Sequence, residues 1–162
     1  MQRDRMTKDA SVQREQALRR LGTREPMCQE CGETDPLVLT GHAPEIRCYE
    51  CGKQARGQRP TEDHHPAGRY NSAVTMPVPA NCHRRLSAAQ ELWPVETLRN
   101  PTQSPLLRTA ATLRGLQDIQ TILLMELLDQ LPETLEALDA LLTTRHGPAW
   151  WDSTGPEGGW TS

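Results

Sequence analysis

Three histidines are the residues of this chain best suited to hydrolytic chemistry. His64 and His65 are adjacent, and His83 follows eighteen positions after His65. Hydrolysis of a phosphodiester needs a base that deprotonates water and a cation that neutralises charge on the phosphate and the leaving oxygen. A neutral imidazole and a divalent metal ion supply both. Neighbouring residues of an extended segment point to opposite sides, so one of the paired histidines can bind metal while the other faces a substrate. Ordinary surface positions are the alternative for all three.

Four cysteines upstream of these histidines form two CxxC pairs, Cys28 with Cys31 and Cys48 with Cys51. Sixteen residues separate the pairs, and the glycine after each pair lets the chain turn tightly around an ion. This pattern predicts a tetrahedral structural Zn²⁺ site. The chain does not open with a charged-then-apolar signal segment, so we expect a reducing, cytoplasmic compartment rather than disulfides. We expect the fifth cysteine, Cys82, to be a small buried residue.

Short secondary-structure elements must hold these groups in place. The sequence predicts a basic helix over residues 11–21, and the apolar stretch 37–40 indicates two short strands around the zinc site. We expect the paired histidines on one strand of a β-hairpin and residues 74–78 on the other, where prolines keep the strand short or at an edge. A run of good helix formers begins at His83, which such a hairpin would bring toward His64.

The C-terminal half of the sequence has a different character. Residues 91–104 are predicted to be a proline-containing linker, and leucines at helical spacings predict a long helix from Pro105. We expect Pro132 to break this helix, which makes residues 105–145 a helical hairpin arm. The arm either packs on the core, self-associates or docks on a protein partner, and acidic residues interrupt its apolar run too early for a membrane span. Residues 146–162 are expected to be a flexible tail whose tryptophans anchor a partner.

Composition limits both the size of the core and the affinity for nucleic acid. The 162 residues include 13 prolines and no phenylalanine, so we expect an α+β fold with one modest core that a structural metal stabilises. The acidic excess lies in residues 91–162, with ten acidic against four basic residues, whereas residues 1–24 carry seven basic and three acidic residues. The predicted basic helical extension at 1–26 and the zinc-stapled core at 27–90 can therefore face phosphates, with modest affinity.

Taken together, these motifs resemble those of the HNH endonuclease family. They are the double CxxC, His-His-x-x-Gly-Arg from His64 and Asn-Cys-His-x-x-Leu-Ser from Asn81, and they span about 60 residues. The resemblance implies a ββα-metal fold and cleavage of DNA to 5′-phosphate and 3′-hydroxyl ends. It also implies that His64 and His83 hold a catalytic Mg²⁺ or Mn²⁺ ion and that His65 is the general base. In a register shifted by one residue, Asp63 would be the ligand and His64 the base.

The resemblance leaves the residue that orients the base open. Family members usually carry an asparagine at the position of Val74, so Asn71 or Asn81 would take that role here. Small stand-alone members of the family often travel with phages. The alternative function is a non-catalytic zinc-binding module that interacts with nucleic acid or protein. Three arginines near the histidines are placed to contact a nucleic-acid backbone: Arg69, Arg84 and Arg85.

Overall fold

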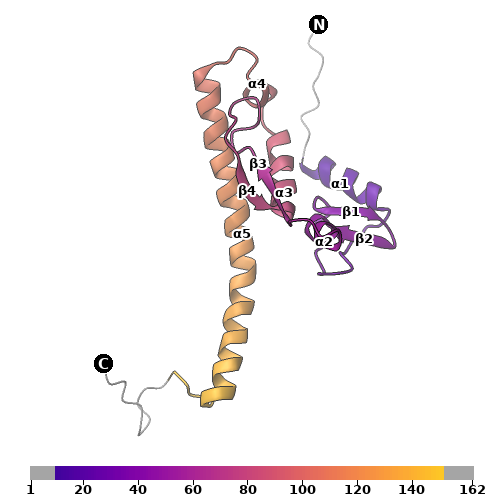
Figure 1. Cartoon of the computed structure of the whole chain (residues 1–162), viewed down its shortest axis with the longest axis vertical. Helices are drawn as coiled ribbons and strands as arrows, with labels where there is room; N and C mark the ends of the chain where they lie inside the picture. Colours follow the sequence, from indigo (N-terminus) through magenta and orange to yellow (C-terminus); the bar gives the residue numbers. More distant parts are fainter. Residues whose placement is uncertain (1–9, 152–162) are drawn as a thin grey trace, which may run out of the picture. The chain divides into compact units, whose positions relative to one another are not determined.

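The computed structural model describes residues 10–151, except for several side chains between positions 123 and 130. The chain divides into two compact units, Met1–Leu123 and Leu124–Ser162. Helices and two small antiparallel sheets confirm the α+β class (Figure 1). In chain order the elements are α1 (Ala10–Leu21), β1 (Leu39–His42), β2 (Glu45–Cys48), α2 (Tyr49–Ala55), β3 (Thr61–His64), β4 (Met76–Pro79), α3 (Ala80–Glu91), α4 (Val95–Arg99) and α5 (Pro105–His146).

The first sheet is the β1–β2 hairpin, on which α1 docks. α1 matches the predicted N-terminal helix, and Gly22 ends it with a φ of 71°, a left-handed conformation that glycine adopts readily. A β-carbon at Gly22 would overlap the imidazole of His42, so the end of α1 lies directly against β1. Five buried residues of this part form one cluster: Leu21, Cys28, Leu39, Ile46 and Cys48.

The second sheet is the β3–β4 hairpin, and α3 follows it without a loop. The strands are antiparallel, with Thr61 opposite Pro79 and His64 opposite Met76. The N–H of Ala80, the first residue of α3, donates to the carbonyl oxygen of Pro60 at 2.8 Å, so the helix starts beside the first strand. A second cluster lies between hairpin and helices: Val78, Cys82 and Leu86, with Met76, Ile119 and Ile122 packed against it. Cys82 is therefore buried, as expected.

The segment 91–104, predicted as a linker, contains α4 and is packed into the first unit. The side chain of Trp93 is buried with Ala67 and Ala111, and Leu98 packs against them. Its indole Nε1 donates to Asp118 Oδ2 at 2.9 Å, which joins the segment to α5. These contacts give the region after α3 a fixed position beside the histidine pair.

The predicted helical hairpin is not formed, because α5 continues from Pro105 to His146 with Pro132 inside it. Proline lacks the N–H that would bond the carbonyl oxygen of Leu128, which costs about 3 kcal/mol in a helix interior. The turns on both sides are rich in leucine, glutamate and alanine, which favour helix. Their backbone bonds are kept when the helix passes through Pro132, and for this reason the predicted break at Pro132 is wrong.

Two further expectations concern the membrane and the chain ends. None of the described helices contains an apolar stretch of the length that a membrane span requires. In the predicted tail, Trp150 donates from Nε1 to Asp139 Oδ1 at 2.9 Å and contacts Trp151 edge-on. Residues 1–9 and 152–162, with the basic N-terminal residues and Trp160, lie outside the described part of the chain.

Candidate functional site

The four CxxC cysteines come together as predicted, from the turn before β1 and from the junction of β2 and α2. Their sulfur atoms all lie within 4.8 Å of one another, and among the described residues no other group of three or more His, Cys, Asp or Glu meets that condition. A tetrahedral zinc site with Zn–S bonds of ~2.3 Å separates its sulfurs by roughly 3.8 Å. The sulfurs of Cys31 and Cys48 are 3.7 Å apart. The set therefore fits a structural zinc ion.

Backbone amides donate to two of the four sulfurs and favour the thiolate form of Cys28, whereas burial raises the pKa of Cys31 and of Cys51. The N–H of Cys48 donates to Cys28 Sγ at 3.2 Å, and the N–H of Cys51 donates to Cys48 Sγ at 3.3 Å. Burial opposes ionisation of Cys28, but the N–H groups of Cys48, Cys31 and Glu30 outweigh it and lower the pKa of this thiol to about 7. Cys48 is also the N-cap of α2, a helix that the sequence analysis did not predict.

The three histidines line one groove with a volume of about 550 Å³. His64 comes from the end of β3 and His83 from the first turn of α3. Their ring centroids are 5.4 Å apart, and the ring planes meet at 82°. The hairpin and the helix that follows it therefore bring together two imidazoles that are nineteen residues apart in the sequence.

His65 lies one residue beyond β3 and is partly exposed in the same groove. Its Nδ1 is 3.2 Å from the backbone carbonyl oxygen of Ser72. A carbonyl oxygen can only accept, so this contact assigns the proton to Nδ1 and leaves a lone pair on Nε2. His65 thus has the tautomer that a general base needs.

His64 is held neutral by its surroundings. The side chain is 2% exposed, and burial, followed by repulsion from His83 and His65, lowers its pKa to about 4. Burial also lowers the pKa of His83, although the carboxylate of Glu62 opposes this shift. Gln90 of α3 places its Nε2 3.2 Å from His64 Nε2 and 2.7 Å from the carbonyl oxygen of His65. One glutamine therefore contacts both members of the histidine pair.

Glu62 is a site residue that the sequence analysis missed. Its Oε2 lies 2.9 Å from His83 Nδ1, although the approach lacks the alignment of a hydrogen bond. Lys53 Nζ and Arg84 Nη2 lie 3.2 Å and 3.4 Å from the same carboxylate. Burial disfavours its charge, but the hydrogen bond from Lys53 and the charge of Arg84 outweigh burial and lower the pKa of Glu62. Strand alternation was the available signal, because Glu62 is two residues before His64 and shares its face of β3.

Asp63 is not brought to the other candidate ligands. It is exposed, and alternation along β3 places it on the opposite face from His64. The register in which Asp63 would hold the ion with His83 therefore has no geometric support, whereas His64 and His83 are in contact.

The two candidate asparagines occupy different places. Asn71 is buried in the loop that carries Ser72, and its Nδ2 donates to the carbonyl oxygens of Thr97 at 2.9 Å and Leu98 at 3.3 Å. Asn81 instead joins α3 to α2: its N–H donates to Glu50 Oε1 at 3.0 Å, and its Oδ1 accepts from the Glu50 N–H at 3.3 Å. Only Asn71 supports the loop whose Ser72 carbonyl contacts the imidazole of His65.

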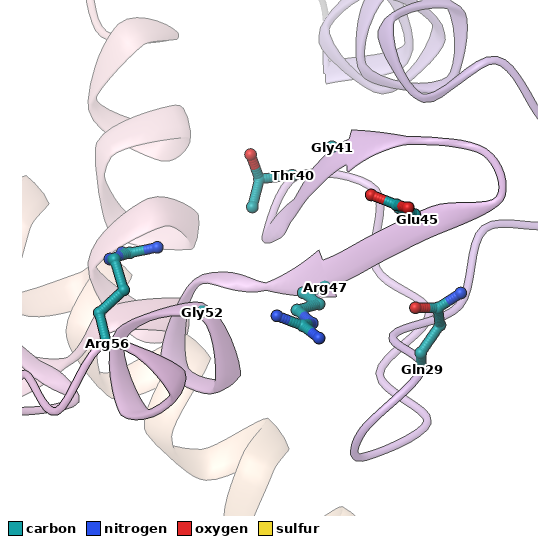
Figure 2. Close-up of a pocket in the computed structure, with 7 residues that line it drawn as sticks. All are labelled: Gln29, Thr40, Gly41, Glu45, Arg47, Gly52 and Arg56. Carbon is teal, nitrogen blue, oxygen red and sulfur yellow. The ribbon is translucent and has the colours of Figure 1, made fainter.

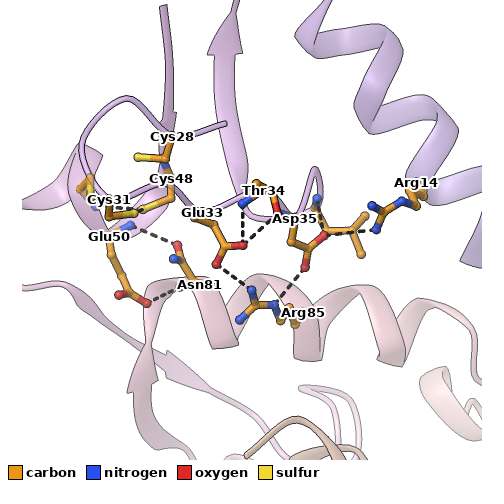
Figure 3. Close-up of polar contacts among 12 residues, drawn as sticks. Arg14, Cys28, Cys31, Glu33, Thr34, Asp35, Cys48, Glu50, Asn81 and Arg85 are labelled. Atoms are coloured by element: carbon orange, nitrogen blue, oxygen red, sulfur yellow. Dashed lines mark hydrogen bonds and ion pairs between the residues drawn. The ribbon is translucent and has the colours of Figure 1, made fainter. Parts of the chain in front are cut away.

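The three candidate arginines differ in how freely they can meet a ligand. Arg85 is bound within the protein, with Nη2 2.7 Å from Glu33 Oε2 and Nε 2.9 Å from Asp35 Oδ2 (Figure 3). Arg84 lies over the ring of Tyr49, 4.1 Å from its centroid, in addition to its contact with Glu62. The exposed Arg69 lines the histidine groove, where Arg99, which the sequence analysis did not single out, joins it.

A second hollow lies on the β1–β2 hairpin, away from the three histidines. Its volume is about 440 Å³, and its lining includes Thr40, Arg47 and Arg56. Figure 2 shows Arg47 rising from β2 and Arg56 from the end of α2 around this space. Arg47 also lies 3.3 Å from Glu30 in an exposed ion pair. Its lining has no histidine or cysteine, and Glu45 is its one carboxylate.

Comparison with known proteins adds no assignment to this geometry. No family model, curated protein or solved structure matches the chain.

Proposed function

We propose that this chain is a metal-dependent HNH-type endonuclease that hydrolyses phosphodiester bonds of DNA. The observation that carries the proposal is the meeting of His64 and His83 in one groove that His65 also lines. The order of an antiparallel hairpin, β3–β4, followed directly by α3 supports a ββα-metal core. The four cysteines support a separate structural zinc ion beside it.

His64 and His83 would hold the catalytic ion. Their donor set suits a divalent transition ion such as Mn²⁺ at least as well as Mg²⁺, because imidazole is a softer ligand than carboxylate. Two protein ligands also leave room for water and phosphate oxygens. When bound, the ion would neutralise charge on the scissile phosphate and on the leaving oxygen.

His65 would activate the attacking water. Its Nε2 takes a proton as the water oxygen forms a bond to phosphorus, and the bond from phosphorus to the 3′-oxygen breaks. The Ser72 carbonyl, which accepts from Nδ1, holds the ring and stabilises the imidazolium that results. The contacts of Asn71 with α4 keep that carbonyl in place.

Arg69 and Arg99 give the groove its positive side chains and would contact phosphates that flank the cut. Their guanidinium groups are cationic, so binding should weaken as salt rises. The proposal assigns no phosphate contact to Arg85, because Glu33 and Asp35 occupy its guanidinium.

The second candidate function is a zinc-binding interaction module without catalysis. One observation favours it: within the described residues, the four cysteines are the only set of three or more ligand groups that converge. In such a module the buried His64 and His83 would stabilise the hairpin against α3, and the groove would bind nucleic acid or protein without cutting.

The deciding experiment is a nicking assay with the zinc-loaded chain, supercoiled plasmid and either Mg²⁺ or Mn²⁺. We expect nicked circles from the wild type and none from His65→Ala. His146→Ala, which removes a histidine at the end of α5 and outside the groove, should nick as the wild type does.

Removal of the divalent ion by a chelator should stop the reaction, and zinc analysis of the same sample should show whether the cysteine site was left intact. Nicking that persists in His65→Ala would remove the assignment of the base. A wild type that binds DNA but leaves it uncut with both ions would favour the interaction module.

A further inference from the structure

We propose that the C-terminal part of α5 is a self-association surface that pairs with the same helix of a second copy of this chain as a coiled coil. Six leucines in this part follow alternating steps of four and three residues. Residues at these steps lie along one line of an α-helix, and their repeat of seven is the pattern of a coiled-coil seam. We call them the leucine seam: Leu124, Leu128, Leu131, Leu135, Leu138 and Leu142.

The leucine seam is not covered by its own unit of the structure. Leu128 and Leu135 are 54% and 57% exposed, and Leu131 and Leu138 are 45% and 47% exposed. α5 is the only helix or strand among the described residues of the unit that begins at Leu124. An isolated helix of mixed composition is marginal in water, and most helices in proteins gain their stability from packing an apolar face. We therefore expect the leucine seam to be stabilised by packing against a partner surface.

The spacing indicates that this partner is another helix. The seam extends over three heptads, residues 124–144, or roughly 30 Å of helix. A leucine occupies every core position from 124 to 142. Apolar core positions sustained over three heptads are typical of a coiled coil, which here lacks most of the charged flanking residues that set partner choice.

The near absence of charge beside the seam favours a second copy over a different chain. Flanking residues normally select the partner of a coiled coil through their charges. Here the flanking positions are 125, 127, 132, 134, 139 and 141, and Asp139 is the one charged residue among them. Asp139 also accepts a hydrogen bond from Trp150 of its own chain.

The acidic character of this segment does not oppose pairing. The exposed residues Glu133 and Glu136 lie on the side of the helix away from the seam, so two copies keep these charges apart. Pro132 is at a flanking position rather than in the seam. The hydrogen bond that it cannot donate would lie within its own helix, so the proline takes no bond from a partner. A row of leucines is complementary to itself, and a second copy is always present. The inference does not rest on the proposed nuclease, because it uses only α5.

The test is the molar mass of the full zinc-loaded chain, measured by sedimentation equilibrium over a series of concentrations. One chain has a mass of 18.2 kDa, and we expect at least twice this mass at high concentration, with dissociation on dilution. The double variant Leu131→Asp, Leu138→Asp should sediment as a single chain, because it would place charges inside the seam.

The matched control is Ala137→Asp with Ala140→Asp, which adds the same charge to exposed positions on the outer side of α5. This control should keep the mass of the wild type. A single-chain mass for the wild type at every concentration would overturn the inference, and that measurement does not depend on whether a variant folds. Dissociation of the control to the same extent as the seam variant would also overturn it. Nicking by each sample reports separately on the nuclease.

Discussion

Gly115 of α5 lies directly against the backbone of Pro66, the residue after His65. A β-carbon at Gly115 would overlap the carbonyl oxygen and carbonyl carbon of Pro66. Only glycine lets the helix approach this closely, and the helix thereby supports the loop that carries the proposed base. The N-terminal half of α5 is thus part of the site, although none of its residues lines the histidine groove.

We expect Gly115→Ala to displace Pro66 and with it His65. Forcing a methyl group into a packed contact costs about 1–3 kcal/mol, and a displacement of the base by about 1 Å lowers the rate by up to ~100-fold. Plasmid nicking should therefore fall strongly while the zinc content stays at the wild-type level.

Gly52→Ala is the matched control, because Gly52 is also helical and its nearest neighbour would be Arg56 Nη1 at 3.6 Å. This variant should keep full nicking, and its stability should be unchanged or up to ~1 kcal/mol higher. Full activity in Gly115→Ala would show that α5 does not position the base.

Much of the core could be predicted because its signals are local. The spacing of Cys28 and Cys31 predicts the zinc site, and Gly22 marks the end of α1. The alternation of side chains along β3 places His64 inward. The helix-forming residues after β4 predict α3, which places His83 opposite His64. In each case the deciding interactions lie within a few residues or within one hairpin.

The other parts of the site depend on contacts between distant segments. Gly115 is forty-nine residues from Pro66 in the sequence. Asn71 donates a hydrogen bond to the carbonyl oxygen of Thr97, which is twenty-six residues away. No periodicity or motif encodes such pairs in one sequence. The break predicted at Pro132 is wrong for a related reason. The local cost of a proline is known from its chemistry, but the outcome depends on the sum of helix propensities around it.

The two asparagines should give different phenotypes when replaced. Asn71→Ala removes the bonds to the carbonyls of Thr97 and Leu98, which frees the loop that holds the imidazole of His65. We expect nicking to fall at least about tenfold. Asn81→Ala removes the bond from the Glu50 N–H and should cost about 1–2 kcal/mol of stability. Nicking per folded molecule should then be kept.

Nicking rates and urea unfolding of both variants separate the two roles. If Asn81→Ala lowered nicking as much as Asn71→Ala while it remained folded, the assignment of the orienting role to Asn71 would be wrong.

Asp118 provides a pH dependence that is independent of the metal sites. Burial raises the pKa of this carboxyl from its usual 3.8, and the hydrogen bond from Trp93 and the charge of Arg114 only partly offset burial. The folded state therefore binds the proton more tightly than the unfolded chain does. Its contribution to stability is present at acidic pH and is lost as pH rises through the folded-state pKa.

We expect Asp118→Asn to remove the loss of stability at higher pH, because an amide does not ionise there. The amide oxygen can still accept from the Trp93 indole. The variant should unfold at a higher urea concentration than the wild type at pH 7, and the difference should shrink as pH falls toward 4. Asp139→Asn alters the exposed pair with Trp150 and serves as the control without burial. A lower midpoint for Asp118→Asn at pH 7 would mean that the charge of Asp118 is needed for the bond to Trp93.

Neighbouring carboxylates on opposite faces of β3 allow a sharp test of how the ion would be held. Glu62 Oε2 lies 2.9 Å from His83 Nδ1 without the alignment of a hydrogen bond, and with the ion bound it would accept from Nδ1 and turn Nε2 toward the ion. Loss of such an outer carboxylate typically weakens metal binding by about 10–100-fold. We therefore expect Glu62→Gln to require at least about ten times more Mn²⁺ for half-maximal nicking.

Asp63→Asn changes the same chemical group one residue later, on the exposed face of the strand. Because Asp63 points away from His64, this variant should need the same Mn²⁺ concentration as the wild type. The opposite result, a large shift for Asp63→Asn and none for Glu62→Gln, would favour the register in which Asp63 is the ligand and His64 the base. Both variants remove one negative charge, so the change in net charge alone does not account for a difference between them.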